Sequence, residues 1–271
     1  MLVAAIQSPV TRDPRSNGEA VRALMRSAHQ AGARLAHFPE DAMSTYPLRE
    51  EETGWDALLD ELEKTAVLAR ELGLWTVVGA SHRLTPPNRP HNSLYVISDK
   101  GEVAGRYDKR LCSFNEIRNY FTPGFDPLVF EVDGFRFGCA ICIEINFPEL
   151  FLEYGRLGVD CVLFSAHSKD PMFGAMAQGH AAANNYWLSV SIPAQFAEAL
   201  PSGVIGPDGR WMTQCANEPR PDLVVVKLDR SAAEFDIPLN KARPWRRVAR
   251  DGAIYAEKRV DDPRSRIKSI F

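Results

Sequence analysis

The sequence predicts an α/β fold in which mixed β-sheets are layered by helices. Short β-rich runs alternate with amphipathic stretches, and this order is typical of α/β proteins. Turn signals such as Asp133-Gly134 separate pairs of expected strands, which indicates hairpins inserted among the β–α units. Hydrophobic residues make up 45% of the 271 residues, enough to bury a large core. Because no Gly/Ser linker or low-complexity break divides the chain, we expect one domain over residues 1–271.

The elements of the first half follow from the apolar pattern and from the residues that interrupt it. Ser16-Asn17-Gly18-Glu19 resembles a capping box, so we expect a helix to open there. Pro39 ends one strand, and Gly73 stops a second helix. The expected elements are strands at 2–7, 33–38 and 74–80, with helices at 16–30 and about 55–72 between them.

The second half contains three expected hairpins and then a region of different composition. The hairpin turns are Asp99-Lys100-Gly101, Asp133-Gly134 and Pro207-Asp208-Gly209. From Lys241 on, the chain is richer in Arg and lacks clear periodicity. We therefore expect residues 241–271 to be an extended C-terminal tail that packs elsewhere, with a partner subunit as one candidate surface. The expected elements are paired strands at 93–98 and 102–107, 128–132 and 135–141, and 203–206 and 210–214, single strands at 160–165, 187–192 and 223–228, and helices from about 147 and at 172–185.

Charge and composition exclude several classes of protein. The net charge is −3 and the isoelectric point is about 6.1, so no general attraction to nucleic acid or to an anionic membrane is implied. No apolar run approaches the ~20 residues needed to span a bilayer. The N-terminal residues 1–7 lack a basic region and resemble a strand rather than a signal peptide. The five cysteines are an odd number without framework spacing, which fits a cytoplasmic location.

Cys142 is expected at the end of an apolar strand and just before a helix. A strand would hold such a thiol rigidly, and the free N–H groups of a helix N-terminus favour its thiolate. Cys139 and Cys142 form a C-x-x-C pattern that could indicate redox chemistry or zinc. However, strand residues three apart point to opposite faces, and no second Cys/His pair follows at zinc spacing. We therefore expect a nucleophile at Cys142 and neither a metal nor a cofactor, although a buried cysteine taken alone is usually a core residue.

Two other short stretches supply candidate partners for this thiol. Glu40 ends His37-Phe38-Pro39-Glu40, and Lys109 lies in the stretch 106–111. Taken alone, each could be an ordinary charged loop residue. In this order, and each in its own local motif, Glu40, Lys109 and Cys142 resemble the catalytic triad of the nitrilase superfamily of carbon–nitrogen hydrolases. Further segments that resemble this family are residues 116–124, 147–150, 181–187 and 203–209.

The resemblance implies a four-layer αββα sandwich, assembled as a homodimer or higher homo-oligomer. It implies that Cys142 is the nucleophile, Glu40 the general base and Lys109 the fixed charge beside the oxyanion. Glu116 stands where the family carries a second glutamate, and we assign it to holding Lys109 or the substrate. The backbone N–H of Ile143 is the expected second donor to the oxyanion. If Glu40 is shielded from water, its pKa should be raised.

Three other residues are candidates for contact with the substrate. His167 follows a strand expected to neighbour the cysteine strand, and Tyr46 and Phe173 lie in stretches expected to shape the pocket. Ile143, Asn146 and His180 depart from the residues common in the family at their positions. These departures leave the class of substrate open.

The leading hypothesis is a cofactor-free hydrolase of non-peptide carbon–nitrogen bonds in a small molecule, acting through a cysteine acyl-thioester that water resolves. Within it, an amidase or an N-carbamoyl amide hydrolase is favoured over a nitrilase acting on a nitrile. A second hypothesis is a Cys–His hydrolase in which His167 or His180 is the base. A third is a catalytically silent binding protein of the same fold.

Overall fold

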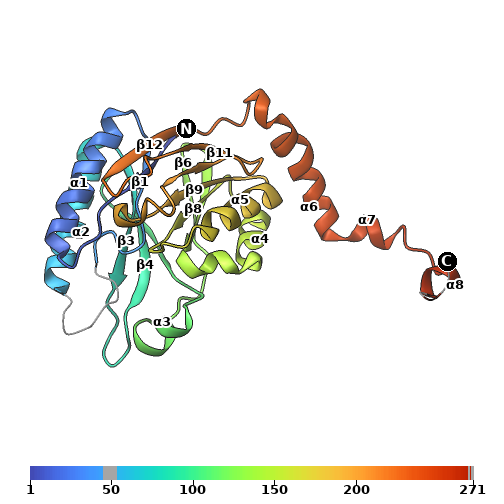
Figure 1. The fold of residues 1–271 in the computed structure, drawn as a ribbon, viewed down its shortest axis with the longest axis horizontal. Helices are drawn as coiled ribbons and strands as arrows, with labels where there is room; N and C mark the ends of the chain where they lie inside the picture. Colours follow the sequence, from blue (N-terminus) through green and yellow to red (C-terminus); the bar gives the residue numbers. More distant parts are fainter. Residues whose placement is uncertain (45–53, 268, 270–271) are drawn as a thin grey trace.

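A computed structural model describes residues 1–44, 54–267 and 269, which form two stacked β-sheets covered by helices on both outer faces (Figure 1). Helices α1 (Pro14–Gln30) and α2 (Trp55–Leu72) cover one sheet, and α4 (Pro148–Arg156) and α5 (Met172–Asn184) cover the other. The layers therefore follow the order α–β–β–α. The expected four-layer αββα sandwich is confirmed.

The first sheet has the strand order β12-β1-β2-β3-β4-β5. Its centre is parallel, because β2 runs parallel to both β1 and β3, and the remaining pairs are antiparallel. The parallel centre follows from the α1 and α2 crossovers that join its strands. The bounds are β1 (Leu2–Gln7), β2 (Leu35–His37), β3 (Trp75–His82), β4 (His91–Ile97), β5 (Val103–Asp108) and β12 (Asp222–Lys227).

The second sheet has the order β11-β10-β9-β8-β7-β6, and β7, β8 and β9 are parallel. The hairpin at Asp133-Gly134 joins β6 and β7 as expected, and both turn residues have positive φ, 49° and 77°. The bounds are β6 (Val129–Val132), β7 (Phe135–Ile141), β8 (Cys161–Ser165), β9 (Trp187–Ser191), β10 (Gly203–Ile205) and β11 (Trp211–Gln214).

The core is divided into three apolar layers by the alternation of side chains along the strands. On β1, Val3 and Ala5 face the second sheet, whereas Ala4 and Ile6 face α1 and α2. At β2 a polar side chain reaches across the layer between the sheets. His37 of β2 is fully buried, and its two ring nitrogens lie 2.9 Å from the hydroxyls of Ser165 and Ser189. These contacts fix the first sheet against β8 and β9.

The capping box expected at Ser16 is wrong. Helix α1 begins at Pro14, and Asp13 is its N-cap, accepting hydrogen bonds from the backbone N–H groups of Arg15 and Ser16. An aspartate followed by proline satisfies the first turn directly, because Pro lacks the N–H that would need a partner. The end of α2 is confirmed, since Gly73 takes the left-handed conformation with φ 60°.

The C-terminal segment is helical rather than irregular. A π-helix, η5 (Asp236–Ala242), leads into α6 (Arg243–Asp251), and α7 (Ala253–Ala256) and α8 (Pro263–Arg266) follow. Figure 1 shows these helices projecting from the sandwich as an arm. No helix in the described part of the chain combines the length and hydrophobicity that a membrane span requires. Within the described residues, the other short helices are α3 (Phe114–Asn119) and the 3₁₀ helices η2 (Cys142–Asn146), η3 (Ala194–Phe196) and η4 (Ala233–Phe235).

Candidate active site

The expected triad residues meet where strands of both sheets end. Glu40 follows β2 and Lys109 follows β5, so both come from the first sheet. Cys142 follows β7 of the second sheet, and His167 lies two residues beyond the end of β8. The backbone N–H of His167 donates to Oε2 of Glu40 over 2.7 Å, which joins the two sheets at this edge. The fold thus assembles one cluster from segments far apart in the sequence.

Glu40, Lys109 and Glu116 form a buried charge cluster. Their exposed fractions are 1%, 1% and 2%. Nζ of Lys109 lies 3.0 Å from Oε1 of Glu40 and 2.6 Å from Oε1 of Glu116. The lysine is therefore held between two carboxylates, and the expected contact of Glu116 with Lys109 is present. Glu116 is itself fixed by a capping box at the start of α3, where the Ser113 N–H donates to its Oε2 over 2.7 Å.

A close approach of two chain segments positions Glu40. Gly79 of β3 lies against the turn that follows β2, and a Cβ on Gly79 would come within 2.4 Å of the Pro39 carbonyl oxygen. Any side chain at position 79 would therefore displace this turn. Asp41, next to Glu40, has φ 56°, so the chain turns sharply at the catalytic candidate.

Cys142 is the first residue of η2 and has a φ of 51°, which is uncommon for a residue with a side chain. The sharp turn presents its thiol at the end of β7, where it is hydrogen-bonded with the Glu40 side chain and with the His167 backbone. Ile143 follows in the first turn of η2, where backbone N–H groups have no acceptor within the helix. This N–H is therefore suited to bind an oxyanion, and that assignment stays a prediction.

The charge states differ from the sequence expectation in two ways. Burial raises the pKa of Glu40, but the charges of Lys109 and His167 and the hydrogen bond with Cys142 outweigh it, so the net pKa is lowered. The expected raised pKa of Glu40 is wrong. Burial and the Glu40 carboxylate raise the pKa of Cys142 well above its usual value, so the expected preference for a thiolate is also wrong. The resting pair is a carboxylate beside a neutral thiol.

Lys109 keeps its charge in this buried position. Burial acts to lower its pKa, but Glu40, Cys142 and Glu116 outweigh this effect and raise the pKa well above its usual value. The ammonium group is thus a permanent positive charge beside the thiol.

Sequence reasoning missed Asn92 as part of the site. Its side-chain amide donates to Oε1 of Glu40 over 2.7 Å, and its backbone carbonyl accepts from the Lys109 N–H over 2.8 Å. Asn92 lies in β4 and is 1% exposed. A buried amide side chain within an apolar strand was the available signal.

Glu144 ties the cysteine segment to the lysine segment. Its buried carboxylate accepts from the backbone N–H groups of Ile141, Arg110 and Leu111 at 2.7, 2.8 and 3.1 Å. The Tyr107 hydroxyl also lies 2.8 Å from both carboxylate oxygens. The carboxylate therefore holds the ends of β5 and β7 in one arrangement, and with them Lys109 and Cys142.

The remaining candidates differ in position. The His167 ring packs edge-on against Phe196, with ring centroids 5.1 Å apart, and its backbone lies in the cluster. Phe173 is 6% exposed and packs against Phe164 in the layer between the second sheet and α5. Tyr46 lies outside the described residues. Substrate contact by these residues stays a prediction.

His180 has its own partners in the described structure. Its Nε2 lies 2.8 Å from the Ile145 carbonyl oxygen, and its ring stacks on Phe151 with centroids 4.0 Å apart. Among the described residues, His180 makes no hydrogen bond or ring contact with Glu40 or Cys142, whereas Glu40 is hydrogen-bonded with the thiol. This geometry favours Glu40 over His180 as the base, and the Cys–His alternative with His167 stays a hypothesis.

Sequence comparison finds several curated proteins that are similar to this chain. The deaminated glutathione amidase of Mus musculus is 29% identical over 184 residues, which cover 60% of this chain and 55% of that protein. The chain thus spans about half the length of this curated relative. Hydrolase Rv0480c of Mycobacterium tuberculosis is 27% identical over 267 residues, covering 87% of this chain and 92% of that protein.

Solved structures with a similar fold include amidases. An amidase from Nesterenkonia sp. AN1 superposes with a TM-score of 0.77 at 21% identity, covering 93% of this chain and 99% of that one. A glutamate-to-glutamine variant of that amidase carries the result of Michael addition of acrylamide at its active-site cysteine. The family model described as carbon-nitrogen hydrolase matches residues 2–236. The chain therefore belongs to the carbon–nitrogen hydrolase family.

Proposed function

We propose that this protein hydrolyses a non-peptide carbon–nitrogen bond in a small-molecule amide or N-carbamoyl compound, through an acyl-thioester on Cys142. The observation that carries the proposal is the buried contact of Lys109 with Glu40, 3.0 Å from Nζ to Oε1, beside the Cys142 thiol. A base, a thiol and a fixed cation in one buried cluster are the groups that acyl transfer requires. The amidases among its relatives support the amide class of substrate.

In the first half-reaction, Glu40 takes the proton from Cys142 as the sulfur attacks the carbonyl carbon of the substrate. The carbonyl π electrons move onto the oxygen, which the Lys109 ammonium and the Ile143 N–H stabilise. When the tetrahedral intermediate collapses, the carbon–nitrogen bond breaks and Glu40 gives its proton to the leaving amine. The products of this step are the free amine and the Cys142 thioester.

In the second half-reaction, Glu40 takes a proton from water as the water oxygen attacks the thioester carbon. Collapse of this intermediate expels the sulfur, which regains a proton from Glu40, and releases the acid. Glu116 acts throughout as a positioning residue, because it holds Nζ of Lys109 over 2.6 Å. His167, Phe173 and Tyr46 are proposed to line the pocket that selects the substrate.

We further propose that residues 1–271 act as one domain with residues 241–271 as its tail, in a cytoplasmic homodimer or higher homo-oligomer. Trp245 and Tyr255 of the tail are 55% and 47% exposed, and a second copy would cover such side chains. All five cysteines are free thiols, which supports a reducing compartment.

A screen of ammonia release across amides, N-carbamoyl compounds and nitriles tests the proposal, with Cys142→Ala as the blank. We expect turnover of an amide or N-carbamoyl substrate that vanishes in the blank. Turnover confined to nitriles would establish the nitrilase alternative. Stoichiometric labelling of Cys142 by iodoacetamide without any turnover would establish the catalytically silent alternative.

A further inference from the structure

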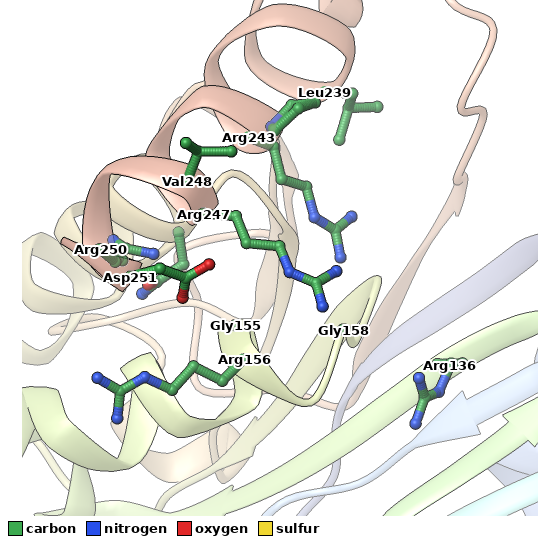
Figure 2. A pocket seen from close by; sticks show the side chains of 12 residues that line it. Arg136, Gly155, Arg156, Gly158, Leu239, Arg243, Arg247, Val248, Arg250 and Asp251 are labelled. Carbon is green, nitrogen blue, oxygen red and sulfur yellow. The ribbon is translucent and has the colours of Figure 1, made fainter. Parts of the chain in front are cut away.

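A cavity of about 830 Å³ lies between helix α6 and the body of the protein (Figure 2). None of Glu40, Lys109, Glu116 and Cys142 lines it. One wall is formed by α6, and the other by the end of α4, the loop after it and the start of β7. This volume is in the range of small-molecule sites. Its charged lining residues are five arginines and one aspartate, namely Arg136, Arg156, Arg243, Arg247, Arg250 and Asp251.

Two of these arginines already have partners in the protein. Arg243 lies 3.6 Å from Asp160 and donates to the Val159 carbonyl over 2.6 Å. Arg250 donates to the Ala183 carbonyl at the end of α5 over 2.8 Å. The Arg250 contact is the ordinary use of arginine at a helix C-terminus, where carbonyl groups lack partners, and the Arg243 contacts hold the loop before β8.

The other three arginines of the lining differ from Arg243 and Arg250 in their contacts. Arg136, Arg156 and Arg247 form no ion pair in the part of the chain that the structure describes. Figure 2 shows Arg247 and Arg156 on facing walls of the cavity. Burial and then the neighbouring charges of Arg246 and Arg156 lower the pKa of Arg250, which shows that positive charge is crowded here. Asp251 is the one acidic residue in this lining, so positive charge is in excess, and the excess cations repel each other unless an anion lies among them.

The remaining lining adds an apolar floor and an acceptor. Leu239 is 8% exposed, and Val248 and Pro244 of α6 lie beside it in the lining. Asn184 is 6% exposed, and its side-chain Oδ1 has no hydrogen-bond partner, although its amide nitrogen donates to the His180 carbonyl. A buried acceptor without a partner can accept a hydrogen bond from a hydroxyl or N–H group of a ligand.

We propose that this cavity binds a small polyanion, a molecule with two or more phosphate or carboxylate groups. The unpaired guanidinium groups on the two walls suit such oxyanions, since arginine binds phosphate and carboxylate with paired N–H donors. The ligand would join α6 to the end of α4 and thereby hold the arm on the body. The proposal does not depend on the hydrolase activity.

Isothermal titration of the full-length protein with tripolyphosphate and with citrate tests it, at an ionic strength kept constant with sodium chloride. We expect saturable binding of at least one probe and a rise in melting temperature. The probe that binds identifies phosphate or carboxylate as the ligand group. The double variant Arg156→Gln/Arg247→Gln should bind about tenfold or more weakly, because charge-assisted hydrogen bonds are lost. Arg210→Gln is the matched control, since this side chain is 88% exposed and lies outside the cavity.

Equal affinity in the double variant and the control would overturn the proposal, as would the absence of saturable binding of either probe. Dissociation of an oligomer by the double variant, with unchanged anion binding, would assign the cavity to an interface between copies instead. Circular dichroism checks the fold of each variant. Arg136→Gln, at a position remote from α6 in the sequence, provides an independent single variant that should also weaken binding.

Discussion

The backbone N–H of His167 donates a hydrogen bond of 2.7 Å to Oε2 of Glu40, and this bond crosses from one sheet to the other. The other carboxylate oxygen, Oε1, accepts from Asn92 and Lys109. Each oxygen of Glu40 therefore has a fixed partner, and the carboxylate has one orientation. A base held in this way is in place for the thiol before any substrate arrives.

Replacing Cys142 and Cys139 one at a time should show which of the two thiols is the nucleophile. Cys142→Ala should abolish turnover and retain the fold, because alanine fits a small half-buried site. Cys139→Ala should keep most activity, since this thiol is fully buried between the sheets and its pKa is strongly raised by burial. Steady-state rates and circular dichroism provide the measurement. Equal inactivity of two folded variants would contradict the choice of Cys142.

Lys109→Met should lower kcat by roughly 10²–10³, the usual loss for one oxyanion-stabilising group. It should also lower the melting temperature, because Glu40 and Glu116 would remain buried without their shared cation. Lys100→Met is the control, since Lys100 is exposed in the turn between β4 and β5, away from this cluster. A loss of less than about tenfold in a folded variant would remove Lys109 from the proposed chemistry.

Glu40→Gln should stop turnover while leaving the thiol reactive. The Glu40 carboxylate raises the pKa of Cys142, so its removal should lower that pKa and increase the fraction of thiolate beside Lys109. We expect iodoacetamide to label Cys142 in the variant at least as fast as in the parent at neutral pH. Intact-protein mass spectrometry after timed quenching measures the rate. Normal turnover by the variant would favour a histidine base.

Asn92→Ala should reduce kcat by about tenfold, because one hydrogen bond to a charged group is lost, with little change in KM. The Asn92 amide stabilises the charged form of Glu40, so its removal should raise the pKa of that carboxyl. The fall of kcat/KM on acidification should therefore begin at a higher pH in the variant. Asn119→Ala, on the exposed end of α3, serves as the control. An unchanged pH profile would limit Asn92 to a packing role.

His37 should make stability depend on pH. Burial lowers its pKa from 6.5 to about 3. Between these values the unfolded chain binds a proton that the folded protein does not bind. The free energy of unfolding should therefore fall as pH drops through this window, and His37 should contribute about 1.4 kcal/mol per pH unit to the fall. Above pH 6.5, His37 should have no effect on the pH dependence of stability. Urea titrations of the parent and His37→Gln at several pH values measure the difference in slope, and parallel curves would contradict the assignment.

Much of the fold is readable from local sequence because its elements carry strong local signals. Asp133 and Gly134 both need positive φ, and residues of these types adopt it at low cost, so the β6–β7 hairpin is predictable. Helix α6 is different. It buries no residue, and its arginines hold it to the body through polar contacts with Asn185 and the end of α5. No apolar stripe marks such a helix in advance.

The candidate site likewise contains residues that are predictable from the sequence and contacts that are not. Glu40, Lys109, Glu116 and Cys142 each lie in a recognisable local motif. The contact of Asn92 with Glu40 spans 52 residues and exists only because β3 and β4 pair beside β2. The charge states of Glu40 and Cys142 depend on how the effect of burial compares with that of neighbouring charges. The sequence alone gives the size of neither effect.

Because the candidate site is divided between the two sheets, turnover should depend on the position of one sheet relative to the other. Glu40, Lys109 and Glu116 belong to the first sheet and its loops, whereas Cys142 and His167 belong to the second. A small slide of one sheet over the other would separate base from thiol without breaking a single bond within either sheet. Under rising pressure or mild urea, turnover should therefore cease while the far-ultraviolet circular dichroism of the strands and helices still persists.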